Sequence, residues 1–554
     1  MTDSLTRIRA YHEQTKHHPD RYARSLGFME WHSQPNPFRR YEGSERYDLD
    51  YRLRPGGPLW DELFRGPVPE PVPLDLANVA CLLRDSLALS AWKQLPGGPA
   101  WTLRVNPSSG NLHPTEAYLL LPGLAGAAAD PSLYHYAPYE HILERRRGLA
   151  GACWDALAAC LPPGGFFMGL SSIFWRESWK YGERAYRYCQ HDIGHIIAAL
   201  DLSARCLGWR VRVISGYRRS SLARLLAIDD QQGPEAEHAE CLLAVLPIGT
   251  ADALREPDLE SLPVPEETSS GSANRLSPYH HDWPIIDSVA AAAGDAARGT
   301  GSSCPAVVRN DPDVAPEDLR ACTARQIIHQ RRSAIALDGR SSMPRAVAAR
   351  IWRRLLPQAN PWWDELMSWP TCISPLLLVH RVEGLEPGIY ALPRSADHLA
   401  SLKTVFADGA WLPMDDPVLG PDRLHLLRPG SVQRQSMEIA CQQEIAANGA
   451  FAVAMLADFE RMLERFGCSA YAQMFWECGA LGQALYCEAE AAGYRGTGLG
   501  CYLDDGMHAL FGTHDRSWQD LYHFTVGTPA EDHRLRSADP YTHRYSDEDL
   551  AATG

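Results

Sequence analysis

The sequence predicts an α+β protein in which one chain contains two similar halves. Three observations lead to this prediction: the length of the chain, a long helical pattern that occurs twice, and a short strand pattern that also occurs twice. The 554 residues are too many for one ordinary hydrophobic core, so two or three domains are expected. Apolar residues make up 45% of the chain and charged residues 22%, which is normal for a globular protein.

Two long helical patterns contain the same features in the same order. One begins at Asp192-Ile-Gly-His and ends at Gly208, and the other begins at Glu477-Cys-Gly-Ala and ends at Gly493. Each has an acid, a small residue, an apolar stripe and a terminal glycine. A second matching pair is Tyr134-His-Tyr-Ala-Pro and Gly388-Ile-Tyr-Ala-Leu. An internal duplication with a pseudo-twofold arrangement explains both pairs, and two unrelated amphipathic helices are the alternative.

The chain divides into five segments by composition and periodicity. These are a wrapping segment (1–73), a first half (74–249), a linker with one docked strip near Tyr279–Ile286 (250–322), a second half (323–536) and a loose polar tail (537–554). Apolar periodicity predicts long helices over Ala185–Leu207, Met437–Phe466 and Met474–Ala492, and strands over Leu376–Val382 and Gly388–Leu392.

Charge and cysteine usage exclude several classes of function. A net charge of −15 argues against nucleic acid or an anionic membrane as partner, because both attract basic surfaces. No run approaches the roughly 18–20 apolar residues that span a bilayer. The first residues contain no apolar signal core, so a cytoplasmic protein is expected. The fourteen cysteines include no Cys-x-x-Cys, which argues against a zinc ribbon and indicates reduced thiols.

A loop rich in hydrogen-bond donors lies between two apolar runs of the first half. Pro107 and Pro114 can neither continue a helix nor donate to a sheet, so the segment between them must be a shaped loop. The backbone N–H groups of residues 108–110, two hydroxyls and the Asn111 amide suit a polar, flat or anionic ligand. A simple surface turn is the alternative.

The amino-acid sequence of this loop favours a ligand site. Pro107-Ser-Ser-Gly-Asn-Leu-His-Pro114 resembles the Pro-Ser-Ser-x-Asn-x-Gln-Pro signature of the FMN-dependent nitroreductase superfamily, with His113 in place of Gln. In that family the loop reaches across a twofold interface to a flavin held by the other subunit. The resemblance therefore implies that the other half of this chain holds the flavin, and that the following loop residues contact it: Pro107, Ser108, Ser109, Asn111 and His113.

The second half contains segments that resemble the flavin-holding parts of the family. Arg331-Arg332-Ser333 is similar to the family's Arg-Arg-Ser, which contacts the ribityl chain and phosphate; paired guanidiniums suit a phosphate clamp. Gly496-Thr497-Gly498-Leu499-Gly500 is similar to the loop whose backbone lies against the reactive edge of the flavin ring, where glycine permits close approach. Arg534 and Arg536 resemble a terminal basic pair that closes on the phosphate.

Each half lacks what the other half has. The second half has no copy of the serine–asparagine loop, and its corresponding stretch at 357–363 is spelled differently. In the first half, the counterpart of the arginine clamp is Arg84-Asp85-Ser86, where an acid would oppose a phosphate, and no glycine loop follows Gly208. The simplest interpretation is a single flavin at the interface of the two halves, with its second site lost.

Lys180-Tyr181 resembles the Lys-Tyr pair of the SagB-type azoline dehydrogenases. The resemblance implies a catalytic role for both residues in proton transfer, since oxidising an azoline removes a hydride and a proton. A lysine can act as the base if burial lowers its pKa. A basic and aromatic helix start, held by Glu177 and Glu183, explains the same residues equally well.

Two further clusters are not expected to carry chemistry. His191 and His195 lie four residues apart on one helical face, but no third ligand is evident, so no metal is expected. Asp504-Asp505 is typical of a turn.

Taken together, the motifs resemble tandem nitroreductase-like proteins of the SagB/ThcOx type. The resemblance implies two α+β halves that form an intramolecular pseudo-dimer, FMN as cofactor, and hydride transfer to or from flavin N5. It also implies an azoline or peptide-derived ring as substrate, with biosynthetic partner proteins. A reductase of small quinones or nitroaromatic molecules is one alternative, and a non-catalytic flavin-binding scaffold of a biosynthetic complex is another. The substrate, the electron acceptor and any further association of chains stay open.

Overall fold

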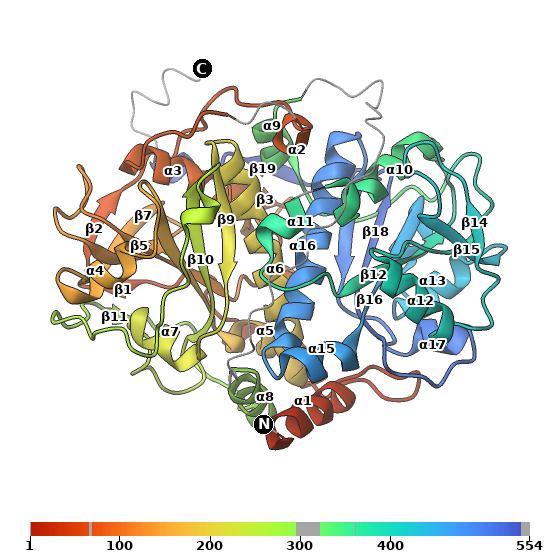
Figure 1. Cartoon of the computed structure of the whole chain (residues 1–554), viewed down its shortest axis with the longest axis horizontal. Helices are drawn as coiled ribbons and strands as arrows, with labels where there is room; N and C mark the ends of the chain where they lie inside the picture. Colours follow the sequence, from red (N-terminus) through yellow and green to blue (C-terminus); the bar gives the residue numbers. More distant parts are fainter. Residues whose placement is uncertain (1, 66–68, 295–321, 361, 545–554) are drawn as a thin grey trace.

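In the computed structural model, two large sheets lie on either side of a pair of long helices (Figure 1). The structure describes residues 2–65, 69–294, 322–360 and 362–544. Within these ranges each half of the chain contributes one seven-stranded sheet. The prediction of an α+β chain with two similar halves that pair within one molecule is confirmed.

The sheet of the first half is antiparallel throughout its described strands. In spatial order these are β2 (Glu45–Asp48), β7 (Ile142–Gly148), β6 (Ser132–Ala137), β5 (Thr115–Leu121), β8 (Phe166–Ser172), β10 (His238–Pro247) and β9 (Trp209–Ile214). The central strands β5 and β8 are buried along their whole length, because helices cover both faces of the sheet.

The sheet of the second half repeats this order. Its strands are β14 (Leu412–Met414), β15 (Leu424–Pro429), β13 (Gly388–Ala391), β12 (Ile373–Val379), β16 (Phe451–Ala457), β18 (Gln519–Gly527) and β17 (Arg495–Leu499). In both halves a long helix follows the central strand and leads to an edge strand, which then pairs with the last strand. Strand β12 thus corresponds to β5, and β17 corresponds to β9.

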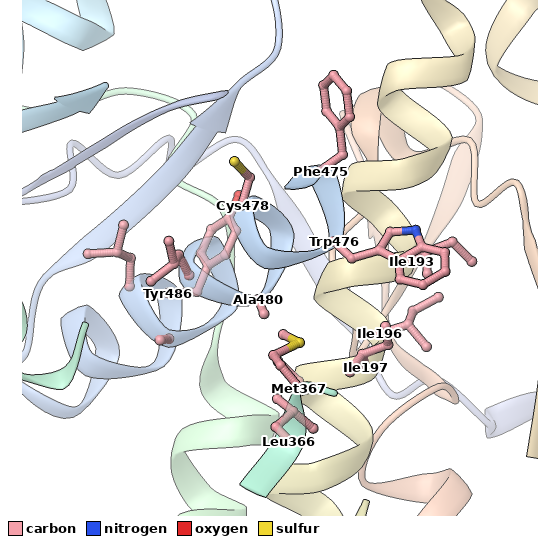
Figure 2. Close-up of a cluster of buried hydrophobic side chains, with 14 of the residues drawn as sticks. Ile193, Ile196, Ile197, Leu366, Met367, Phe475, Trp476, Cys478, Ala480 and Tyr486 are labelled. Atoms are coloured by element: carbon pink, nitrogen blue, oxygen red, sulfur yellow. The ribbon is translucent and has the colours of Figure 1, made fainter. Parts of the chain in front are cut away.

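The two long helices, α6 (Ala185–Arg205) and α16 (Ala470–Ala491), cross in close contact at the centre of the molecule. Gly194 and Gly479 lie at the crossing: a Cβ atom on Gly194 would be 2.2 Å from the Trp476 carbonyl oxygen, and one on Gly479 would be 2.2 Å from the His191 carbonyl oxygen. Glycine is needed at both positions because the helix backbones themselves are in contact. Figure 2 shows the apolar side chains that pack beside the crossing, among them Ile193, Ile196 and Trp476.

Shorter helices cover the outer faces and the ends of the sheets. They are α2 (Glu62–Arg65), α3 (Leu76–Arg84), α4 (Ala152–Ala158), α5 (Phe174–Tyr181), α7 (Arg219–Leu225), α9 (Ala324–Gln330), α10 (Arg345–Arg354), α11 (Trp362–Leu366), α12 (Ala396–Val405), α13 (Gln433–Ile439), α14 (Glu444–Asn448), α15 (Phe459–Phe466) and α17 (Gly506–Leu510). Helices α4 and α7 form a core with the outer face of the first sheet, and α12 and α17 do the same for the second.

The prediction of one long helix over Met437–Phe466 is wrong. The segment contains α13, α14, the central strand β16 and α15. Strand β16 reads Phe-Ala-Val-Ala-Met-Leu-Ala and is buried on both faces, so every residue is apolar and no alternation marks it as a strand. A continuous apolar run of this length has no periodicity that separates a buried strand from a buried helix.

The wrapping segment and the linker meet at two places on the surface of the molecule. From the wrapping segment come α1 (Thr2–Gln14), β1 (Tyr41–Glu42) and the sheet strand β2. From the linker come β11 (Ser272–Ala273), which pairs with β1, and α8 (Pro284–Gly294), which packs against α1. The expected docked strip is therefore a helix that begins at Pro284, and Tyr279 before it is exposed. Residues 295–321 of the linker lie outside the described residues.

The tail returns from the second half to the first. Strand β19 (Arg536–Ala538) pairs with β3 (Leu89–Gln94), which in turn pairs with β4 (Ala100–Arg104). Tyr541 is fully buried, and its hydroxyl donates to the Pro138 carbonyl over 2.8 Å. The expectation of a loose tail is wrong for residues 537–544, because a buried tyrosine with a satisfied hydroxyl fixes them. Residues 545–554 lie outside the described residues.

Candidate functional site

A cavity of about 850 Å³ opens at the interface of the two halves. Its wall contains residues from the serine–asparagine loop and β4 of the first half, from the segment after α9, from α6 and α16, and from β17. This volume lies in the range of sites for cofactors and other small molecules. The cavity is therefore the candidate site, and neither half could form it alone.

The serine–asparagine loop has a fixed shape on one side of the cavity. The Ser109 N–H and hydroxyl both donate to Oδ1 of Asp192 on α6, over 3.1 and 3.2 Å. Gly110 has a φ of +61°, and a Cβ atom there would lie 2.7 Å from the Tyr181 hydroxyl and 3.0 Å from Lys180 Nζ. Glycine is required at this position because Lys180 and Tyr181 sit directly against the loop.

Four of the five predicted loop residues line the cavity, namely Pro107, Ser108, Ser109 and Asn111. His113 does not line it. Its backbone N–H donates to the Ser108 hydroxyl over 2.8 Å, and its ring Nε2 lies 3.0 Å from Asn111 Oδ1. Burial, together with the nearby Arg104, keeps the pKa of His113 well below its usual value. A neutral His113 behind the loop therefore orients Asn111.

The predicted arginine clamp lines the same cavity as this loop. Arg331, Arg332 and Ser333 all line the cavity, directly after α9 ends. Arg331 donates through Nε and Nη2 to the Val105 carbonyl, over 3.2 and 3.0 Å, so it ties the second half to the start of the loop. Its Nη1 is buried with no hydrogen-bond partner among the described residues.

The electrostatics of this end of the cavity favour an anion. Burial lowers the pKa of Arg331, and burial next to Arg331 lowers that of Arg332 to about 10. Lys93 lines the same cavity, and so does Arg495, which pairs with Glu531 over 3.2 Å. Burying cations close together costs free energy unless an anion accompanies them, and the free Arg331 Nη1 is a donor for one.

The segment Gly496–Gly500 is largely a strand and not the predicted loop. Residues 495–499 form β17, an edge strand paired with β18. Thr497, Gly498, Leu499 and Gly500 line the cavity, whereas Gly496 does not. A Cβ atom on Gly498 would lie 1.9 Å from the Tyr522 hydroxyl. The glycine is thus required by a neighbouring tyrosine on β18, whatever ligand lies on the other side.

The structure does not bring Arg534 and Arg536 to the cavity. Arg534 is exposed and pairs with Asp532 over 2.9 Å, two residues away. Arg536 lies exposed in β19, opposite Gln94 of β3. Arg534 thus lies in the turn before β19, and Arg536 lies at the start of that strand. Lys93 and Arg495, which no sequence motif marks, are the additional cations that line the cavity.

Lys180 and Tyr181 end helix α5 beside the loop. Tyr181 lines the cavity and its ring is tilted against that of Tyr188, with ring centroids 4.4 Å apart. Lys180 contacts the loop from a half-buried position. Glu177 lies one turn earlier, fully buried, and neither carboxyl oxygen has a hydrogen-bond partner among the described residues. Burial and the nearby Asp192 raise the pKa of Glu177 well above its usual value.

Several site residues gave no separate signal in the sequence. Asp192 appeared only as the acid of the repeated helix pattern, yet burial raises its pKa to about 7, and the serine loop binds it. Tyr486 accepts the Gly498 N–H over 3.0 Å and bonds the Ser333 hydroxyl over 2.9 Å. Other wall residues that no motif marked include Tyr188 and Tyr522, and His195 stood out only as a possible metal ligand. Tyr188 and Tyr486 lie on the buried helices α6 and α16, and Tyr522 lies in the buried strand β18, so periodicity alone assigns them to the core.

The place that the pseudo-twofold relates to the cavity is filled by protein. In the first half the serine–asparagine loop precedes β5 and lines the cavity together with β17. At the related position, α11 precedes β12, the counterpart of β5, and packs against β9, the counterpart of β17. The Trp362 indole donates to Asp201 over 2.6 Å, and Glu365 pairs with Arg205 and Arg210 over 2.7 and 2.9 Å. Tryptophan side chains and ion pairs therefore occupy this position.

Asp85, the acid in the first-half counterpart of the arginine clamp (Arg84-Asp85-Ser86), also has partners. Asp85 pairs with Arg325 and His329 of α9, each over 2.7 Å. The carboxylate that would repel a phosphate instead joins the first half to the second.

The two histidines on α6 make separate contacts. His191 Nε2 lies 2.9 Å from the Leu521 carbonyl, and His195 Nε2 lies 3.1 Å from the Tyr522 hydroxyl. Within the described ranges, no group of three metal-ligating side chains could hold an ion. Nor does any described helix have the length and apolar character needed to cross a membrane.

Comparison with known proteins gives relatives that match part of the chain and a structural match over nearly all of it. No family model matches the chain. The trifolitoxin-processing protein TfxB of Rhizobium leguminosarum bv. trifolii is 30% identical over 174 residues, which are 30% of this chain and 46% of TfxB. A protein of Methanocaldococcus jannaschii that is named a candidate nitroreductase is 25% identical over 130 residues, 22% of this chain and 64% of that protein. The chain thus spans about half to two thirds of the curated relatives that it matches.

The structural match covers nearly the whole molecule. The crystal structure of a candidate nitroreductase from Anabaena variabilis has a TM-score of 0.69 and 21% identity, and the match covers 95% of this chain and 99% of that one. The chain therefore has a nitroreductase-like fold, with two such halves in one molecule.

Proposed function

We propose that this protein is an FMN-dependent oxidoreductase with one flavin site, located in the cavity between its two halves. One observation carries the proposal: a donor loop from the first half and an arginine pair from the second half face the same cavity. The two segments are more than 200 residues apart in the sequence. Each resembles a different nitroreductase motif, so the two resemblances are independent of each other. The nitroreductase-like fold supports the same assignment.

The residues of the cavity fit FMN in charge and in shape. At one end, Arg331 Nη1 is a buried donor without a described partner, and Arg332 and Lys93 add positive charge, which suits a phosphate. At the other end, Ser108, Asn111 and the backbone of β17 offer polar groups for a flat heteroaromatic ring. Bound FMN would supply the redox chemistry by taking or giving a hydride at N5.

The chain's own residues would bind substrate and handle the proton. Lys180 and Tyr181 contact Gly110 in the loop. From this position their side chains would reach a substrate bound over the flavin ring. The buried acids Glu177 and Asp192 both have raised pKa values, to about 7 for Asp192, and each holds a proton more readily than an exposed acid. We infer that Lys180 and Tyr181 exchange a proton with the substrate. Glu177 and Asp192, which lie behind them, would then take up or release a proton in turn.

The substrate class that we favour is an azoline or another peptide-derived ring of a biosynthetic pathway. The similarity to a trifolitoxin-processing protein supports this choice, as does the resemblance of Lys180-Tyr181 to the azoline dehydrogenase pair. Partner proteins of such a pathway would then deliver the peptide. Reduction of small quinones or nitroaromatic molecules is the second candidate, and the similarity to a candidate nitroreductase favours it.

Purified full-length protein tests the proposal directly. We expect a yellow protein with flavin absorption and about one FMN per chain after reconstitution. Protein that binds no FMN would contradict the flavin assignment, and two FMN per chain would contradict the single site. The Lys180→Ala variant should keep its FMN but lose turnover of an azoline-containing peptide, with Arg534→Ala as an exposed control. Unchanged turnover in Lys180→Ala would remove the proton-transfer role.

A further inference from the structure

Two cysteines from distant parts of the second half come together at the wall of the cavity, and one of them lines it. Cys501 lies directly after β17 and lines the cavity, and Cys441 lies in the turn between α13 and α14. Their thiols lie close enough to influence each other's protonation, and both residues are half-buried. Gln443 Nε2 fixes the two segments together, because it donates to the Ala440 and Cys501 carbonyls over 2.8 and 2.9 Å.

A histidine from the wrapping segment completes this cluster. The backbone N–H of Ala23 donates to Nδ1 of His17 over 2.9 Å, so the ring proton of a neutral His17 is on Nε2. That proton is available to the Cys501 sulfur, and His17 favours the thiolate form of Cys501. The His17 backbone N–H is itself held by Asp504 over 2.7 Å. The sulfur of Cys501 thus has a donor on each side, and a thiolate is stabilised there.

The turn that carries Cys441 has an unusual backbone. Cys441 and Gln442 have φ values of +53° and +64°, two consecutive left-handed residues without a glycine. Side chains other than glycine seldom adopt this conformation, and such strain is concentrated at functional positions. Here it directs the Cys441 side chain towards Cys501. The hydrogen bond from Cys441, with His17 and Arg184 nearby, lowers the pKa of Cys501 to about 5, and the pKa of Cys441 is raised.

We propose that Cys501 and Cys441 form a reversible dithiol–disulfide pair in the cavity wall, in which a hydroperoxide oxidises Cys501 first and Cys441 resolves the product. In the first step the Cys501 thiolate attacks the terminal oxygen of the hydroperoxide, the O–O bond breaks, and an alcohol or water leaves with a proton. In the second step Cys441 attacks the sulfenic sulfur of Cys501 and water leaves. Overall, two thiols and one hydroperoxide give one disulfide, one alcohol or water, and one water.

The half-buried cysteines elsewhere in the described chain do not have this arrangement. Cys160, at the end of α4, lies outside the cavity, and burial raises its pKa. It serves as an internal reference, because it is half-buried as well and its thiolate is disfavoured. The redox pair does not depend on the flavin assignment, since both sulfurs and His17 belong to the protein.

Peptide mapping of the full-length protein tests the proposal. After treatment with one equivalent of hydrogen peroxide, non-reducing mass spectrometry should find the peptides of Cys441 and Cys501 linked, and dithiothreitol should release them. In Cys441→Ser, dimedone should label Cys501 at least tenfold more than Cys160. In Cys501→Ser, labelling of Cys441 should fall to the level of Cys160.

Two results would overturn the pair. One is wild-type protein in which Cys501 is labelled no more than Cys160 and no link forms. The other is oxidation of Cys501 without a link to Cys441. Because the mapping measures covalent bonds and needs no turnover, it can succeed even if the protein binds no FMN, so failure of the proposed function is distinguishable from failure of this inference.

Discussion

Replacing Gly479 with alanine should destabilise the protein, although alanine is the better helix former. A Cβ atom at this position would lie 2.2 Å from the His191 carbonyl oxygen and 2.8 Å from the His195 nitrogen. Both obstacles are backbone atoms of α6, so no side chain can rotate away. The helices would have to separate by about 1 Å to restore ordinary van der Waals contact.

Two opposing terms set the magnitude. Alanine in place of glycine within a helix contributes about 1 kcal/mol of stability. Forcing an extra methyl group into a packed interface costs about 1–3 kcal/mol, and backbone obstacles place this case at the upper end. We therefore expect Gly479→Ala to lower the free energy of unfolding by about 2 kcal/mol.

Urea denaturation followed by tryptophan fluorescence measures this change. Gly98→Ala is the matched control, because the nearest atom to its added Cβ would be 3.5 Å away; its effect should be within about 0.5 kcal/mol. Gly194→Ala faces the same crossing from the other helix. The double variant should cost less than the sum of the single variants, since one separation of the helices relieves both contacts. A Gly479→Ala protein as stable as the wild type, or more stable, would refute the backbone contact.

Three further predictions concern the cavity and its filled counterpart. Arg331→Ala should weaken FMN binding by about ten- to a hundredfold, through loss of charged hydrogen bonds, whereas the exposed Arg534→Ala should not; equilibrium dialysis measures both, and equal affinities would argue against the clamp. Asp192 has a folded pKa of about 7 against its ordinary 3.8, so the stability it contributes at low pH should be lost between about pH 4 and 7. The difference between the urea midpoints of the wild type and Asp192→Asn should fall as the pH rises through that range. A difference that does not change with pH would contradict the raised pKa. Trp362→Ala should cost about 3–5 kcal/mol in the same assay without changing the FMN stoichiometry, and a second bound FMN would show that the tryptophan alone closes the other position.

The parts of the fold that could be predicted are those with a recognisable pattern within a short stretch of sequence. The acid, small residue and terminal glycine of α6 recur in α16, so their pairing as equivalent elements was visible, as was the shaped loop between Pro107 and Pro114. Strand β16 was missed because a strand buried on both faces contains no polar residue to show its period. The docked tail was missed because one buried residue, Tyr541, fixes it.

The cavity itself was predictable only in part. Motifs that are contiguous in sequence, such as Ser108-Ser109 and Arg331-Arg332, resembled known patterns and do face the cavity. Cations such as Lys93 and Arg495 reach it from strands β3 and β17, and only the tertiary arrangement of the two halves brings them together. Arg534 and Arg536 were misplaced because a basic pair near the end of a chain has no local feature that fixes its direction.

The tryptophan-filled position opposite the cavity has a consequence for how such a protein changes over time. In a symmetric homodimer every substitution appears twice, so a residue that blocks one pocket blocks both. Covalent joining of the two copies removes that restriction, and α11 could become a structural plug while the serine–asparagine loop kept its polar groups. The price is that a single occupied pocket cannot show cooperativity between identical sites, so ligand saturation of one chain should follow a simple hyperbola.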